Sequence, residues 1–98
     1  MRFVQPLVAQ SLSGTTPAKL GSGEKRAGLL IRNHDPAALV WVGMVPRGTS
    51  APTLTGTAHI HAIAPNSTLA LYLSESVDVY AQSATGAAVA ISSQEFRS

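Results

Sequence analysis

The sequence predicts an all-β domain: a small antiparallel β-sandwich or jelly-roll-like barrel of about six to eight short strands. Short runs rich in Val, Leu and Ile alternate with polar residues, as expected for half-buried strands. Turn residues such as Gly, Pro and Asn recur about every eight to twelve positions, and no helical periodicity outlasts a single turn. The 98 residues suffice for one domain with one core.

The first part of the chain, residues 1–25, is expected to form an N-terminal arm and edge segment. Residues 2–11 alternate like a strand, but Pro6 lacks the N–H that a sheet ladder needs. This favours an edge position, or an arm that pairs with a neighbouring subunit. A very short strand is expected at 18–20, followed by a flexible Gly-rich loop.

The centre of the predicted domain is a β-hairpin at residues 27–44. Two apolar runs flank a patch with Asn, Asp and Pro, which favour turns through their backbone geometry. Period-two alternation places Arg32 and Trp41 on one face of this hairpin. The opposite, inward face holds Leu29, Ile31, Val40 and Val42.

The remainder of the predicted core, which spans residues 26–93, consists of a long loop and four more strands. The loop at 45–57 contains two Pro and two Gly and is expected to be exposed, so it is a candidate contact surface. Strands are expected at 58–63, 69–73, 77–81 and 87–92. Their inward residues are predicted to be Leu69, Leu71, Leu73, Val77, Val79, Val89 and Ile91. Residues 94–98 are expected to be a loose tail.

The composition indicates a surface that associates with other molecules. Charged residues make up 12% of the chain, against about 25% in ordinary soluble domains. Fifteen alanines dilute the apolar residues, so the core is lean. A surface so poor in charge is weakly protected against association. We expect copies of the chain, or a larger assembly, to cover part of it; a monomer with a Ser/Thr-rich surface is the alternative.

Several partner classes are not expected. The net charge of +2 and the lack of interleaved aromatic and basic residues argue against nucleic-acid binding. No apolar run approaches the about 20 residues of a membrane span, so no membrane association is expected. Cysteine is absent, which excludes disulfides and thiol chemistry.

Candidate catalytic and metal-binding residues are sparse. No serine stands in a Gly-x-Ser-x-Gly turn, so we expect no enzymatic activity and no cofactor. His59 and His61 lie two apart on an expected strand and so face the same way, but a zinc site needs three or four ligands. We therefore expect no metal.

The polar face of the strands carries a second candidate site. Period-two alternation places these residues opposite the core: Trp41, Tyr72, Tyr80 and Asp78. Aromatic side chains beside a polar group are typical of subunit interfaces, which is the interpretation we adopt. Carbohydrate recognition by the aromatic rings is the alternative.

Four segments between residues 26 and 91 form a recognisable pattern. They read Arg-x-x-Leu-x-Ile-x-Asn at 26–33, Val-Trp-Val-Gly at 40–43, Ile-Ala-Pro-Asn-Ser-Thr-Leu-Ala-Leu at 63–71, and Val-Asp-Val-Tyr-Ala at 77–81. A Thr-Gly turn and a closing strand follow the last segment. In this order the chain resembles small β-sandwich virion proteins encoded by tailed bacteriophages.

The resemblance implies a symmetric oligomer that binds the major capsid protein or another virion protein. We expect a capsid decoration or cement protein, synthesised in the host cytoplasm and carried on the head surface of the virion. A homotrimer is expected because capsids have quasi-threefold positions. The alternatives are a neck, tail or head-fibre-base protein, or a carbohydrate-binding module that contacts the host surface. The expected docking residues are Arg2, Phe3, Val4, Arg47, Thr49 and Leu54.

Overall fold

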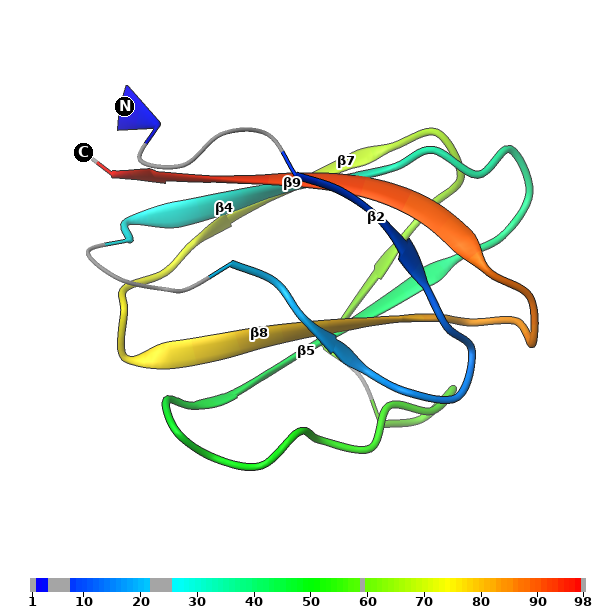
Figure 1. Cartoon of the computed structure of the whole chain (residues 1–98), viewed down its shortest axis with the longest axis horizontal. Coiled ribbons are helices and arrows are strands. Elements are labelled where there is room, and N and C mark those ends of the chain that lie inside the picture. The colour runs from blue at the N-terminus through cyan, green and yellow to red at the C-terminus, as the bar shows by residue number, and fades with distance from the viewer. Residues whose placement is uncertain (1, 4–7, 22–25, 59, 98) are drawn as a thin grey trace.

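A computed structural model describes residues 2–3, 8–21, 26–58 and 60–97, and in these ranges the chain forms nine strands. The strands are β1 (Arg2–Phe3), β2 (Val8–Leu12), β3 (Ala18–Lys19), β4 (Gly28–Asn33), β5 (Val40–Pro46), β6 (His61–Ile63), β7 (Thr68–Tyr72), β8 (Val77–Ser83) and β9 (Val89–Arg97). All their pairings are antiparallel. Figure 1 shows them as two packed layers.

The two layers have the strand order of a jelly roll. Sheet A contains β2-β9-β4-β7, with β1 also paired to β9, and sheet B contains β3-β8-β5-β6. From β2 onward the chain changes sheet at every connection except β5 to β6. Apart from β1, the two sheets have four strands each, and four-stranded sheets joined in this way form a jelly roll, so the predicted fold class is confirmed.

The predicted hairpin at 27–44 is wrong, because its two strands belong to different sheets. β4 pairs with β7 and β9, whereas β5 pairs with β6 and β8. The turn between them is real: Asp35 Oδ1 accepts hydrogen bonds from the N–H groups of Ala37 and Ala38, at 2.8 and 2.7 Å. It turns the chain from one sheet to the other instead of within one sheet.

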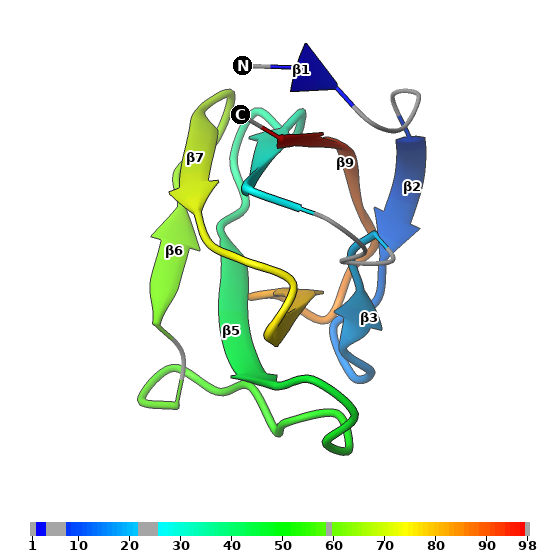
Figure 2. The same ribbon diagram turned by 90° about the vertical axis from the view of Figure 1, so that its left-hand side faces the viewer.

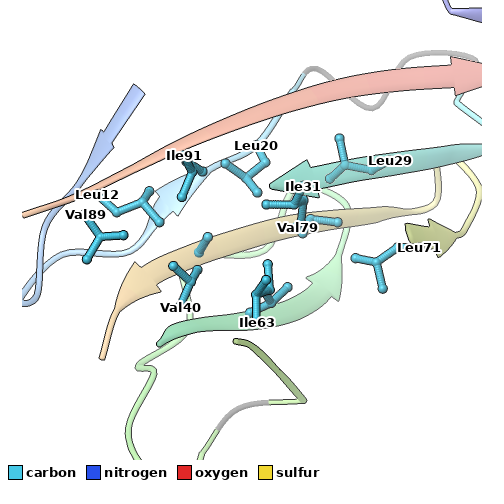
Figure 3. Packing of buried hydrophobic residues seen from close by; sticks show 12 residues of the cluster. Leu12, Leu20, Leu29, Ile31, Val40, Ile63, Leu71, Val79, Val89 and Ile91 are labelled. Atoms are coloured by element: carbon cyan, nitrogen blue, oxygen red, sulfur yellow. The ribbon is translucent and has the colours of Figure 1, made fainter. Parts of the chain in front are cut away.

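The core lies between the sheets and contains most of the predicted inward residues (Figure 3). Eight of the predicted side chains are buried, namely Leu29, Ile31, Val40, Val42, Leu71, Val79, Val89 and Ile91. The predicted Leu69, Leu73 and Val77 are half-buried.

Both predicted boundaries of the core are too narrow. Leu12 and Leu20 are core residues, so the sandwich begins well before residue 26. At the other end β9 continues to Arg97, and Phe96 is 3% exposed. The expected loose tail is therefore a strand as far as residue 97.

The turns gather at two opposite ends of the sandwich. At one end the Ala84 N–H donates to the Leu39 carbonyl at 3.0 Å, joining two turns. At the other the Arg47 N–H donates to the Ser76 carbonyl at 2.9 Å. We call this second end the terminal end. It comprises β1, the turn at 73–76 and the start of the 47–60 loop. Figure 2 looks onto it.

Candidate interaction surfaces

The outer face of sheet B carries three of the predicted patch residues, Trp41, Tyr80 and Asp78. The register places Gly43 of β5 opposite Tyr80 of β8. Trp41 lies two residues from Gly43, and Asp78 lies two residues from Tyr80, so they share the same face of the sheet. Trp41, Tyr80 and Asp78 therefore all face away from the core, as predicted. Trp41 and Tyr80 are half-buried and Asp78 is 3% exposed.

Residues 52–56 of the 47–60 loop fold back over this outer face. Leu54 is 4% exposed, and a Cβ atom placed on Gly43 would lie 2.6 Å from its side chain. The absence of a side chain at Gly43 thus makes room for Leu54. The expectation that Leu54 is an exposed docking residue is wrong, because this leucine covers its own sheet.

Asp78 anchors the start of the same loop. Its carboxylate accepts a hydrogen bond from the Gly48 N–H at 3.0 Å and lies 3.5 Å from the Lys19 ammonium. The Gly48 hydrogen bond holds the pKa of Asp78 below its usual value, and the Lys19 charge acts in the same direction although burial opposes both. Asp78 therefore has a structural role in this chain.

Tyr72 lies on the other sheet, so the predicted aromatic patch is not one surface. Its side chain is 76% exposed on the outer face of sheet A. Its ring meets that of Phe96 edge to face, with centroids 5.7 Å apart and planes at 73°. A single carbohydrate platform formed by Trp41, Tyr72 and Tyr80 is therefore excluded by the sheet assignment.

The terminal end contains a buried ion pair that the sequence analysis did not predict. Arg26 Nη1 lies 3.3 Å from Glu95 Oε2, and both side chains are 1% exposed. Arg26 Nη2 also donates to the carbonyls of Ser74 and Val77. Burial lowers the pKa of Arg26, while the Glu95 charge opposes that shift. Period-two alternation continued from the predicted strand at 87–92 would have placed Glu95 on the inward face and so indicated its burial. Residues 94–98 were instead expected to be a loose tail.

Four of the predicted docking residues, Arg2, Phe3, Arg47 and Thr49, lie at the terminal end. Arg2 and Phe3 form β1, opposite Arg97 and Phe96 of β9. The exposed Arg47 donates from Nη1 to the Glu75 carbonyl at 3.2 Å. Thr49 is also exposed, with its N–H bonded to the Pro46 carbonyl.

The predicted docking residue Val4 lies outside the described residues.

A shallow depression of about 220 Å³ lies on the outer face of sheet A. Its lining is formed by Leu30, Arg32, Thr68, Ser92, Ser93 and Gln94. Arg32 Nη1 donates to Thr68 Oγ1 at 3.2 Å, and Ser92 Oγ lies 2.8 Å from His34 Nε2. These groups can hydrogen-bond a carboxylate or a hydroxyl of a partner. The sequence predicted that Arg32 faces outward, but the strand register that assembles its neighbours was not predictable.

The histidines do not assemble into a metal or catalytic centre within the described residues. No group of three potential ligands among His, Cys, Asp and Glu is found there. His61 is half-buried on β6, and His59 lies outside the described ranges. The nearest carboxylate to His34 in sequence, that of Asp35, binds backbone N–H groups through Oδ1.

Comparisons of the chain with protein-family models, with curated proteins and with solved structures found no match. In the part of the chain that the structure describes, no helix has the length and apolar character needed to cross a membrane.

Proposed function

We propose that this chain is a non-enzymatic structural protein of a tailed bacteriophage, a capsid decoration or cement protein that associates with itself and docks on the major capsid protein. The observation that carries the proposal is the jelly-roll strand order in a chain with 12% charged residues. Jelly rolls are common in viral capsid domains, which supports the proposal by analogy of fold. The sequence resemblance supplies the phage class.

The outer face of sheet A supports the self-association part of the proposal. Among the described outward positions of β2, β4, β7 and β9, Arg32 carries a charge and the others are uncharged. The others are Ala9, Ser11, Gly28, Leu30, Thr68, Ala70, Tyr72, Ala90, Ser92, Gln94 and Phe96. Depletion of charge and exposed aromatic side chains such as Tyr72 are typical of interface cores.

The terminal end supports the docking part. It brings β1, whose residues come from the start of the chain, to the same end of the sandwich as Arg47 and Thr49. Arg47 is exposed and its charge is available to an acidic surface of a capsid protein. A trimer is the copy number that a quasi-threefold capsid position favours.

Purified particles of the phage that encodes the chain provide the test. Mass spectrometry of the particles is expected to detect the chain, and electron microscopy to place it on the head surface. Particles that lack the gene product are expected to bind purified chain, and binding is expected to weaken for Arg47→Glu. Absence of the chain from particles, with no binding by the depleted particles, would overturn the proposal. Density at the neck, tail or fibre base would move it to that location.

A further inference from the structure

Strand β7 is an open edge of sheet A. It pairs with β4 on one side, and no other described strand pairs with it (Figure 2). The Asn33 N–H donates to the Ser67 carbonyl at 2.9 Å, and the Leu73 N–H donates to the Ala27 carbonyl at 3.0 Å. Odd-numbered residues from 67 to 73 therefore direct their N–H and C=O groups toward β4. The backbone groups of the even-numbered residues are directed to the open edge.

This edge lacks the features that usually prevent strands from pairing with other chains. Exposed edges are commonly protected by charged residues, proline, bulges or very short strands. Residues 67–73 contain no charge and no proline. By contrast, β3 at the edge of sheet B is two residues long, contains Lys19 and follows Pro17. β6 at the opposite edge of sheet B is three residues long.

The open groups of β7 are self-complementary. They belong to Thr68, Ala70 and Tyr72, which are evenly spaced about Ala70. If a second copy runs antiparallel with Ala70 opposite Ala70, Thr68 of each copy lies opposite Tyr72 of the other. Each opposed pair then exchanges two hydrogen bonds in the antiparallel pattern, so every open N–H and C=O of these residues gains a partner.

The side chains fit the same register. On the outer face, Thr68 meets the exposed Tyr72 of the second copy, and the small Ala70 side chains meet at the twofold axis. On the inner face, Leu69 meets Leu71 of the second copy as a close, non-hydrogen-bonded pair. Leu69 is half-buried in the single chain, so pairing covers apolar surface that is now partly open.

We infer that β7 is a self-recognition edge: two copies of this chain join their β7 strands about a twofold axis at Ala70, so that sheet A continues across the dimer. The inference rests on the self-association in the proposed function and adds the β7 edge of sheet A to its outer face as a contact surface. An interface of this symmetry closes at two copies. A trimer requires a head-to-tail contact through another surface, so the dimer is inferred for the free chain in solution and the trimer is proposed for the chain bound to the capsid.

A cysteine at the twofold position tests the register. The chain has no cysteine, so Ala70→Cys introduces a single thiol. In the inferred dimer the two Cα atoms at position 70 are about 5.5 Å apart, which lies within the disulfide range. Mild oxidation is expected to convert most of the variant to a covalent dimer. The matched control is Ala88→Cys, an exposed alanine in the turn that precedes β9, which is expected to remain largely uncrosslinked.

A proline at the same position tests the hydrogen bonds. The N–H of Ala70 faces the open edge, so Ala70→Pro removes an intermolecular donor and leaves the β4 ladder intact. Sedimentation velocity is expected to show a dimer for the native chain and for Ala70→Val, and a monomer for Ala70→Pro. Circular dichroism checks that each variant is folded, and if the proline variant is not, the crosslinking pair decides.

The inference is overturned if the native chain stays monomeric, or if Ala70→Cys crosslinks no better than Ala88→Cys. Particle binding is measured separately on Ala70→Pro. If the edge inference fails but the native chain binds particles, the proposed function stands without this interface. If the dimer forms and particles do not bind it, the docking proposal fails alone.

Discussion

The side-chain Nδ2 of Asn33, the last residue of β4, donates to the carbonyl of Ile63, the last residue of β6, at 3.1 Å. The bond joins sheet A to sheet B through a fully buried amide. Nδ2 also donates to the Ala38 carbonyl at 2.8 Å, and Oδ1 accepts the Asp35 N–H at 2.9 Å. Asn33 therefore holds the turn that carries the chain from one sheet to the other.

Replacing Asn33 is expected to destabilise the fold strongly. Asn33→Leu leaves the buried Ile63 carbonyl and the half-buried Ala38 carbonyl and Asp35 N–H without this partner. A buried unsatisfied group costs about 1–3 kcal/mol, and the half-buried groups cost less because water reaches them. We expect a loss of about 2–3 kcal/mol in the free energy of unfolding measured with urea. The exposed Asn66→Gly is the control for loss of an asparagine side chain, because glycine adopts the φ of 56° at this position without strain. A change below about 0.5 kcal/mol for Asn33→Leu would contradict the assigned role.

The Arg26–Glu95 pair is expected to be sensitive to loss of either partner. Glu95→Gln leaves the buried Arg26 charge without its counter-ion, and breaking a buried pair in this way typically costs about 3–5 kcal/mol. Urea unfolding is expected to show that the double variant Arg26→Met/Glu95→Leu loses less stability than the sum of the losses of Arg26→Met and Glu95→Leu. The exposed Arg47→Met serves as a control, with an expected change within about 0.5 kcal/mol. Additive losses would show that the two residues do not interact.

Asp78 is expected to make stability dependent on acid pH. Its pKa is lower in the folded chain than in the unfolded chain, chiefly because the Gly48 N–H binds the carboxylate. The contribution is therefore fully present above the unfolded value of about 3.9 and is lost as the pH falls through the folded pKa. Urea unfolding at pH 7 and at several values below 4 measures it. Asp78→Asn is expected to reduce the loss of stability that the native chain shows as the pH falls below 4. An unchanged pH dependence in this variant would contradict the role assigned to Asp78.

Leu54 is expected to hold the 47–60 loop against sheet B. Leu54→Ala removes a buried side chain, with an expected cost of about 2–4 kcal/mol, and frees the loop. Limited trypsin digestion is expected to cleave after Arg47 faster in this variant than in the native chain. Gly43→Val is expected to give the same result, because its side chain would occupy the position of Leu54. The exposed Thr53→Ala is the control, and equal cleavage rates in all four proteins would exclude the anchoring role.

The fold class followed from the sequence because strand alternation is a local property. Period-two spacing identified the inward side chains of β4 and β5, including Leu29 and Val42, without knowledge of their partners. It also placed Trp41 and Arg32 away from the core, and both face outward. They lie on different sheets, however, and not on the one shared face that the predicted hairpin required. Pairing is not local, however. Asp35 signals a turn, but the contacts of Asn33 with residues 30 positions away decide that the turn joins two sheets.

The candidate surfaces were less predictable for the same reason. Leu54 stands in a Pro- and Gly-rich segment, and only the proximity of Gly43 shows that it is covered. The sequence around Arg26 is typical of an exposed basic residue. Its burial depends on the ion pair with Glu95, which lies 69 residues later in the chain. The depression at Arg32 depends on the register of three strands.

The central claim is that this sparsely charged jelly roll is one subunit of a larger structure. Sedimentation equilibrium of the purified native chain, from low micromolar to millimolar concentration, tests that claim most directly. We predict a mass that rises with concentration from 10.1 kDa to that of a defined oligomer. A mass that stays at 10.1 kDa throughout this range would contradict it.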